Sequence, residues 1–413
     1  MSLIKPFKAI RPAVPYAPMV AALPYDVLNA EEARAIGQIN PLSFLHVEKS
    51  EIDIPGYPQV EEAEVFDMAR RNLLKLLSDH ILVREAKPCF YVYSQKMGEH
   101  TQYGIVAAAG VGEYEAGKIK KHEHTRADKE RERTLHIDRV NAHTGPVFLT
   151  YKKHDAIDRL VDRFIAAPPD YAFTAEDGIS HTAWTIAGDD DIRSISAAFA
   201  DIDALYIADG HHRAAAAAAV AKMRRERAQA PRGDEPYEFF LAVIFPHNQL
   251  RVMDYNRVIR DLNGLDEQAF RDKVGQTFDI YPGFTKRSPT AIHEFGLYLG
   301  GAWYRLVAKD GVYDPTDPVK SLDVSILQDC LLGPILGIQD PRTDKRIDFI
   351  GGIRGMDELE RLVDSGRFQV ALSLYPTSLA QLIAVADAGK VMPPKSTWFE
   401  PKLRSGLFVN PLD

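Results

Sequence analysis

The chain has 413 residues, of which 46% are hydrophobic and 26% charged, and this length suits two or three domains with cores of their own. Its formal net charge of -8 argues against a protein that mainly binds nucleic acid, because such proteins carry a strongly basic surface. With two widely separated cysteines, no apolar run of the roughly 18 residues that a bilayer span requires, and no apolar signal region, we expect a cytoplasmic protein without membrane contact.

The first 87 residues predict an extended and helical region. Five prolines within residues 6–24 restrict the backbone to extended and turn conformations. Residues 31–39 are expected to form a short helix and residues 43–47 a strand. Residues 61–77 carry apolar side chains at helical spacing, which predicts a surface helix with one buried stripe.

Residues 88–262 have the pattern of a sheet-containing core. Strands are predicted over residues 90–93 and 103–111, with a polar hairpin around Gly98 between them. Residues 239–245 and 250–255 are apolar and flank a Pro-His-Asn turn, so we expect a second hairpin that closes the central sheet.

Within this core, the sequence LYIADGHHRAAAAAAV predicts a buried strand, a tight turn and an alanine-rich helix. The first N–H groups of such a helix point outward with the positive end of its dipole behind them, which favours phosphate binding. The polar residues at this joint are Asp209, Gly210, His211, His212 and Arg213. The alternative is a helix capped by Asp209 that carries exposed histidines and an exposed arginine and binds no ligand.

The segment IKKHEHTRADKERERT carries a second group of reactive side chains at the end of a predicted strand. Glu123 between His122 and His124 is a candidate general base, and Lys120 and Arg126 are candidates for holding an anionic substrate. Two other interpretations stay open. His122 and His124 share one face of a strand, but a zinc site made from them needs ligands from elsewhere. The charges that follow also fit an exposed helix with i, i+4 pairs.

Residues 263–413 predict a further α+β region. We expect a helix from residue 267, a hairpin over residues 295–307 with Gly300-Gly301 at its turn, and a helix over residues 323–336. Near the end, proline-bounded loops carry candidate substrate-binding residues, namely Lys395, Ser396, Thr397 and Arg404. The alternative for these loops is a docked tail anchored by aromatic side chains.

Several long strings together resemble the family known as domain of unknown function 1015. They include FKAIRP, LPYDV, NPLSFLHVEKSEIDIP, IKKHEHTRADKERERT, NAHTGPVFLTY, ADGHHRAAAA, DPRTDKRIDFIGGIRG and MPPKSTWFEPKLRSGL. That family is similar to the ParB and sulfiredoxin superfamily and to its branch of free serine kinases. The resemblance implies an α+β fold with a ParB/sulfiredoxin-like mixed-sheet core at 88–262, a helical N-terminal addition at 1–87 and an α+β C-terminal addition at 263–413.

The resemblance also implies roles for the two motifs. His122 and Glu123 match an HE pair whose glutamate acts as base, and Asp209, Gly210, His211 and Arg213 match a phosphate turn in which His212 is the variable position. The two motifs are further apart here than in short superfamily members, which implies an insertion between them.

The activity expected from this match is phosphoryl transfer from ATP or ADP, with Mg²⁺, to a small hydroxy amino acid, most simply L-serine. A phosphoserine phosphatase and a nucleotide-binding switch like ParB are the alternatives. A bound metal ion and the oligomeric state are left open by the sequence.

Overall fold

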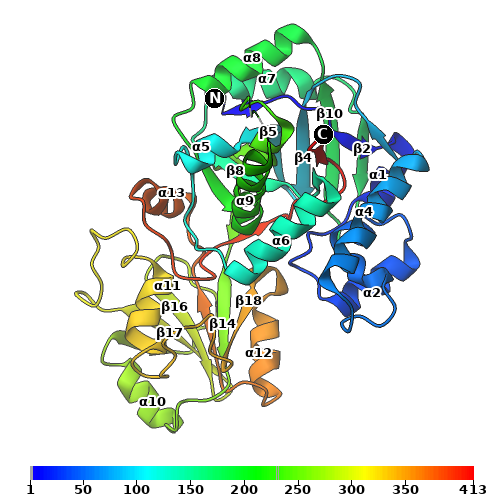
Figure 1. Ribbon diagram of the computed structural model, residues 1–413. Coiled ribbons are helices and arrows are strands. Elements are labelled where there is room, and N and C mark those ends of the chain that lie inside the picture. Colours follow the sequence, from blue (N-terminus) through cyan, green and yellow to red (C-terminus); the bar gives the residue numbers. More distant parts are fainter. Residues whose placement is uncertain (1–2, 229, 231) are drawn as a thin grey trace. The chain divides into compact units, whose positions relative to one another are not determined.

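The N-terminal part is built around a nine-stranded mixed sheet (Figure 1). The structure is a computed structural model that describes residues 3–228, 230 and 232–413. The strands of this sheet, in spatial order, are β6 (Ile119–Lys120), β11 (Leu205–Asp209), β8 (Val147–Tyr151), β12 (Phe239–Pro246), β5 (His100–Gly110), β4 (Phe90–Met97), β10 (Ser180–Ile186) and β9 (Tyr171–Thr174), with β1 (Ile4–Lys5) also paired to β5. The pairs β6–β11 and β8–β12 are parallel and the others are antiparallel. The expected α+β fold with a mixed-sheet core is therefore confirmed.

The two faces of this sheet are covered by different parts of the chain. Side chains alternate between the faces along each strand, and one face packs on α5 (Val111–Glu115), α7 (Asp155–Ile165), α8 (Asp189–Ala200) and α9 (His211–Arg227). On the other face, the rings of Tyr91 and Tyr93 pack against Phe408 from the end of the chain.

The prediction of a hairpin over residues 239–255 is wrong. Strand β12 is buried along its whole length and pairs with β5 and β8 in the middle of the sheet. The next strand, β13 (Arg251–Met253), pairs instead with β20 (Trp398–Glu400). A strand buried on both faces has a continuous apolar run, and this pattern does not distinguish a central strand from the arm of a closing hairpin.

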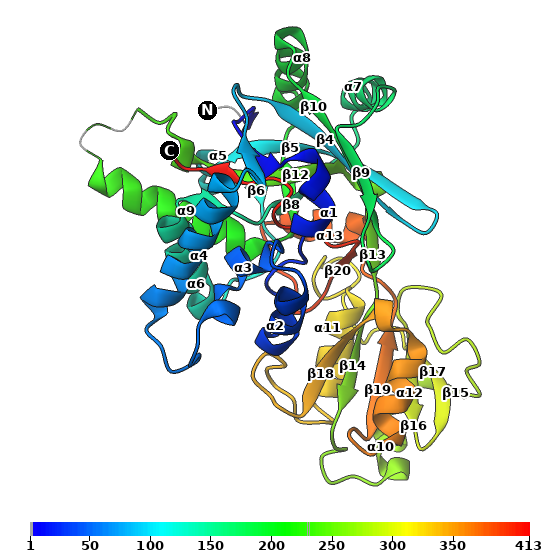
Figure 2. The same cartoon turned by 90° about the vertical axis from the view of Figure 1, so that its right-hand side faces the viewer.

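The N-terminal helices are α2 (Ala30–Ile39), α3 (Leu45–Glu48) and α4 (Glu62–Ser78), and α4 packs along α6 (Ala127–Val140), as both views show (Figures 1 and 2). The prediction of a strand over residues 43–47 is wrong, because helix α3 begins at Leu45. Ser43 starts the turn: its hydroxyl accepts from the Leu45 N–H and its carbonyl from the His46 N–H. The run is too short for an apolar pattern to separate strand from helix.

The chain divides into two compact units rather than three consecutive regions. Unit 1 runs to Leu250 and includes Pro401–Asp413, and unit 2 is Arg251–Glu400. Unit 1 includes the first 87 residues because Phe44, Leu73 and Val409 belong to one apolar cluster. The end of the chain returns to unit 1 through β21 (Asn410–Pro411), which pairs with β7 (Ala142–His143).

Unit 2 has a six-stranded sheet of its own. The order is β15 (Phe278–Pro282), β17 (Ala302–Ala308), β16 (Glu294–Leu299), β19 (Val370–Leu374), β14 (Tyr255–Ile259) and β18 (Ile347–Gly351), and its helices include α10 (Glu267–Val274), α12 (Met356–Asp364) and α13 (Leu379–Asp387). The β16–β17 hairpin confirms the expected turn, because Gly300 and Gly301 both have positive φ. The helix expected over residues 323–336 is shorter than predicted: α11 (Asp323–Leu327) continues into a π-helical turn, Gln328–Leu332.

Within the part of the chain that the structure describes, no helix combines the length and apolar character needed to cross a bilayer.

Candidate functional site

The joint between β11 and α9 has the predicted strand-turn-helix form. Gly210 adopts a left-handed conformation with φ of 93°, and a Cβ placed there would lie 3.5 Å from Cα of Val147. The positive φ favours glycine, whereas the 3.5 Å contact is an ordinary packing distance. Ala214 and Ala217 on α9 are fully buried in the core under the sheet. Their small side chains allow the N-terminus of α9 to lie close to the end of β11.

The register of β6 brings the second motif to this joint. Lys120 on β6 lies opposite Tyr206 on β11, and the two strands are parallel. Residues that follow Lys120 therefore run beside the end of β11. As a result, the rings of His122 and His211 meet edge to face with centroids 4.5 Å apart, and Nδ1 of His211 lies 3.8 Å from Oε2 of Glu123. The amide of His122 donates to Nε2 of His211 at 3.4 Å.

The two histidines are buried, whereas the glutamate reaches solvent. His122 is 2% exposed, and neither of its ring nitrogens has a hydrogen-bond partner among the described residues. Burial lowers the pKa of His122 to about 4. Burial and the neighbouring His122 ring also hold the pKa of His211 well below its usual value. Both imidazoles are therefore neutral near neutral pH, next to a Glu123 side chain that is 38% exposed.

Asp209, the last residue of β11, is fixed from two sides. Its Oδ1 accepts the N–H of Gly210 at 2.8 Å, and its Oδ2 lies 2.9 Å from Nζ of Lys402. Burial acts to raise the pKa of Asp209, but the charges of Lys402 and Arg213 outweigh burial and hold this pKa below its usual range. The carboxylate therefore remains ionised and orients the turn rather than capping α9.

Two further cations lie beside the ring of Tyr206, three residues before the end of β11. The Nζ atoms of Lys120 and Lys152 lie 5.7 Å and 5.9 Å from the centre of the Tyr206 ring. Sequence reasoning selected Lys120 but missed Lys402, the lysine that contacts Asp209. Lys402 lies in the string MPPKSTWFEPKLRSGL, from which the candidates Lys395, Ser396, Thr397 and Arg404 were selected. The sequence feature that could have indicated Lys402 is that it is one of the basic residues of this string.

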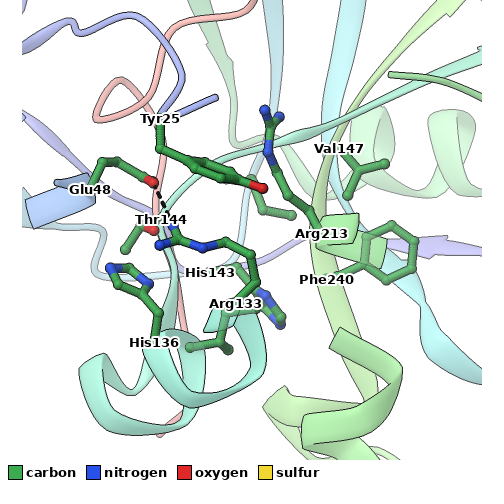
Figure 3. A pocket seen from close by; sticks show the side chains of 12 residues that line it. Tyr25, Glu48, Arg133, His136, His143, Thr144, Val147, Arg213 and Phe240 are labelled. Atoms are coloured by element: carbon green, nitrogen blue, oxygen red, sulfur yellow. Dashed lines mark hydrogen bonds and ion pairs between the residues drawn. The ribbon is translucent and has the colours of Figure 1, made fainter. Parts of the chain in front are cut away.

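A phosphate contact through two parallel hydrogen bonds requires the Arg213 guanidinium to point to solvent, and it does not. Its side chain is 9% exposed, its Nη1 donates to the carbonyl of Pro146 at 2.6 Å, and its Nη2 lies 3.4 Å from the Asp26 carboxylate. The Tyr25 ring lies between the guanidinium groups of Arg213 and Arg133, whose Cζ atoms are 5.7 Å and 4.0 Å from the ring centre (Figure 3). Arg213 thus ties the start of α9 to residues 25–26.

The remaining candidates of the first motif lie on the outside. His124 is exposed, and the exposed Arg126 forms an ion pair with Asp128 at 2.7 Å. The amide of Arg126 donates to Nε2 of His212 at 3.0 Å, which connects this segment to α9 a second time.

The candidates near the end of the chain belong to different units. Arg404 lies in unit 1, where its Nε is 3.3 Å from Nε2 of His181 and its guanidinium pairs with Asp177. The other three lie in unit 2. Two of them order a loop, because the Lys395 carbonyl accepts from Arg257 and the Ser396 carbonyl accepts from Thr377, and Thr397 follows directly before β20. The contacts of Lys395 and Ser396 that the structure shows are therefore contacts within unit 2.

Comparisons with known proteins give a family and a slight structural likeness. The family model described as a protein of unknown function, DUF1015, matches residues 4–325. No curated protein matches the chain. Among solved structures, SbnI with a C-terminal truncation from Staphylococcus aureus is 12% identical, with a TM-score of 0.38 and coverage of 74% of this chain and 87% of that one.

Two further solved structures are similar to the same degree. A conserved hypothetical protein from Pyrococcus furiosus is 11% identical, with a TM-score of 0.36 and coverage of 73% of this chain and 93% of that one. A free serine kinase in complex with AMP is 11% identical, with a TM-score of 0.36 and coverage of 72% and 86%. Likeness this slight assigns neither an activity nor a ligand to the chain.

Proposed function

The chain belongs to the DUF1015 family of proteins of unknown function, and we propose that it is a nucleotide-dependent phosphotransferase that acts on a small hydroxy amino acid, most simply L-serine. One observation carries this proposal: Glu123 lies beside the first residue of α9, with its Oε2 3.8 Å from Nδ1 of His211. A carboxylate that can accept a proton is thereby next to a helix terminus that can hold a phosphate group.

Phosphate recognition would come mainly from the backbone. The first N–H groups of a helix have no partner within the helix and lie at the positive end of its dipole, so they attract anions. Helix α9 has 17 residues, and its first turn contains no acidic side chain. Lys402, whose Nζ lies 2.9 Å from Asp209 at the end of β11, would add positive charge around the transferred group.

The chemical step moves one phosphoryl group and one proton. The acceptor hydroxyl attacks the terminal phosphorus of the nucleotide, the bond from that phosphorus to the bridging oxygen breaks, and the hydroxyl proton passes to Glu123. Glu123 is partly exposed, so an acceptor from solvent can reach it. The proposal of serine as acceptor depends on the motif resemblance and not on this geometry.

An Mg²⁺ ion that accompanies the nucleotide would neutralise charge on its phosphates. Mg²⁺ prefers oxygen ligands and retains water, so the phosphates themselves would be its principal ligands.

The test is Glu123→Gln, which keeps the size of the side chain and removes its ability to accept a proton. We expect phosphoryl transfer from ATP or ADP to L-serine, followed by ³¹P NMR, to fall by about 100-fold or more, while nucleotide affinity by calorimetry changes little. Glu226→Gln, on the exposed far part of α9, is the control. Normal turnover in Glu123→Gln would contradict the role of Glu123 as base.

The direction of the reaction can be tested in the same assay. If the protein is a kinase, phosphoserine gives ATP from ADP when ATP is the donor, or ADP from AMP when ADP is the donor. If the protein is a phosphatase, phosphoserine in water alone gives free phosphate. Nucleotide binding without either reaction would leave the switch-protein alternative.

A further inference from the structure

The two motifs bring together three side chains that are all good ligands for a metal ion. Their ligand atoms lie within 4.8 Å of one another, and these atoms are one nitrogen of His122, one carboxylate oxygen of Glu123 and one nitrogen of His211. His122 and Glu123 are adjacent in the segment after β6, and His211 is the first residue of α9. The cluster therefore exists only because β6 and β11 pair.

The burial of His122 is the independent observation that points to a ligand. The residue is 2% exposed, and both ring nitrogens are enclosed without a hydrogen-bond partner among the described residues. Burying a polar group without a partner is unfavourable, so such groups in native proteins usually have a bound ion, a water or a function. An ion held by a His122 nitrogen would satisfy that nitrogen.

We propose that His122, Glu123 and His211 bind one divalent transition-metal ion of the zinc type. Two imidazoles and one carboxylate form a donor set that suits zinc, and in catalytic zinc sites three protein ligands leave a fourth position for water or substrate. Imidazole nitrogens are poor partners for Mg²⁺, which prefers oxygen, so this site differs from an Mg²⁺ ion carried by a nucleotide.

The distances require only a small closure. Two donors of one ion with bonds of about 2.1 Å lie about 3.4 Å apart in a tetrahedral site, so the cluster must close by roughly 1 to 1.5 Å. Glu123 lies in the irregular segment between β6 and α6, where a change of rotamer can supply this movement. If Nδ1 of His211 is the ligand, the ring proton moves to Nε2, and the long 3.4 Å contact with the His122 amide is lost.

The site also differs from the zinc pair that the sequence alone suggests. His122 and His124 are two residues apart, but His124 is exposed, and it is not a member of the cluster found among the described residues. His211 takes the place that His124 would have had. His124 therefore provides a matched control, because it is a histidine of the same segment outside the cluster.

The ion does not depend on the proposed phosphoryl transfer, because ligand geometry alone predicts it. The two proposals are compatible, since one carboxylate oxygen of Glu123 suffices for the ion and the other remains available for a proton. Metal binding is measured without a nucleotide or an amino acid, so failure of either proposal can be recognised separately.

The test uses the full-length protein, stripped of metal with a chelator and then titrated with Zn²⁺ by calorimetry. Co²⁺ serves as a spectroscopic probe whose absorption reports nitrogen and oxygen ligands at a four-coordinate or five-coordinate site. We expect one Zn²⁺ per chain, an increase in melting temperature with Zn²⁺, and a loss of affinity of at least about 100-fold in His211→Ala and in His122→Ala. His124→Ala should bind Zn²⁺ as the unmodified chain does.

Because His122 is buried, its alanine variant can fail to fold, and Glu123→Gln keeps the proposal testable. Glu123 is partly exposed, so this variant should fold normally, bind Zn²⁺ at least about tenfold more weakly and give an altered Co²⁺ spectrum. The proposal is overturned if the unmodified chain shows no saturable binding of Zn²⁺. It is also overturned if folded His211→Ala and Glu123→Gln bind Zn²⁺ as tightly as His124→Ala does.

Discussion

Nδ1 of His211 lies 3.8 Å from Oε2 of Glu123, which joins two motifs that are distant in the sequence. This contact depends on two backbone features. Gly210 turns the chain so that α9 starts at the end of β11, and the parallel pairing of β6 with β11 delivers His122 and Glu123 to the same place. Both the proposed base and the proposed metal site depend on this single meeting point.

Arg213→Ala should act mainly on stability rather than on phosphate affinity. The side chain is buried and bound to the Pro146 carbonyl and the Asp26 carboxylate, so its removal leaves these groups without a cation and opens a void. We expect the free energy of unfolding to fall by about 3 kcal/mol, measured by urea denaturation. Arg131→Ala removes an exposed arginine paired with Glu62 and should cost no more than about 1 kcal/mol. Equal losses in the two variants would contradict a buried structural role for Arg213.

Lys402→Met should weaken binding of the nucleotide. The substitution removes the cation 2.9 Å from Asp209, and the carboxylate then faces the incoming phosphates without its partner. The phosphates then lose an attracting cation and meet an uncompensated carboxylate, so we expect affinity for ADP or ATP, measured by calorimetry, to fall at least about tenfold. Lys153→Met is the control, because Lys153 is exposed and pairs with Asp155. An unchanged affinity in Lys402→Met would place the phosphate elsewhere.

The parts of the site that local sequence determines were predicted, and those that depend on distant contacts were not. The β11–α9 joint follows from an apolar run, a glycine and alanines that are adjacent in the chain, and it has the expected form. The contact between Glu123 and His211 depends on strand register, which composition does not reveal. The direction of Arg213 is set by Tyr25 and Asp26, which lie far earlier in the chain.

The same distinction between local and distant contacts explains the errors in the predicted fold. The short apolar run at Phe44–Val47 fits a strand or a helix equally well, and the Ser43 turn settles it as helix α3. Strand β12 was expected at the closing hairpin of the sheet, but its position between β8 and β5 depends on pairings with residues about 95 to 140 positions away, which no local pattern encodes. The return of Pro401–Asp413 to unit 1 is a contact of the same long-range kind.

Gly406→Ala should destabilise unit 1. Gly406 has φ of +87°, and a Cβ there would lie 2.6 Å from both Cβ and Cγ of Phe44, which is fully buried. The left-handed backbone costs about 1 to 2 kcal/mol with a side chain, and overpacking adds about 1 to 3 kcal/mol. Gly98→Ala separates the two effects, because Gly98 has φ of +59° and no atom within 4 Å of its added Cβ. If urea denaturation gave the same loss for both variants, the close packing of residue 406 on Phe44 would be disproved.

Asp323 should make the stability of unit 2 depend on pH. The residue is 6% exposed, and burial raises the pKa of its carboxyl to about 7, although the hydrogen bond from the His293 N–H acts to lower it. Between the unfolded value of 3.8 and about 7, the folded state binds more protons than the unfolded state. Stability is therefore greatest below this window and falls as pH rises through it, by up to about 4 kcal/mol.

Asp323→Asn tests this dependence, because its amide oxygen can still accept the His293 N–H but the side chain no longer ionises. The measurement is hydrogen exchange of the β16 and β17 amides. We expect the variant to be as stable as the unmodified chain below the unfolded pKa of 3.8, and to be more stable than it at pH 8. The exposed Asp310 supplies the control variant Asp310→Asn, which should follow the unmodified chain at every pH. Parallel curves for Asp323→Asn and the unmodified chain would mean that the Asp323 carboxyl ionises as freely in the folded protein as in the unfolded one.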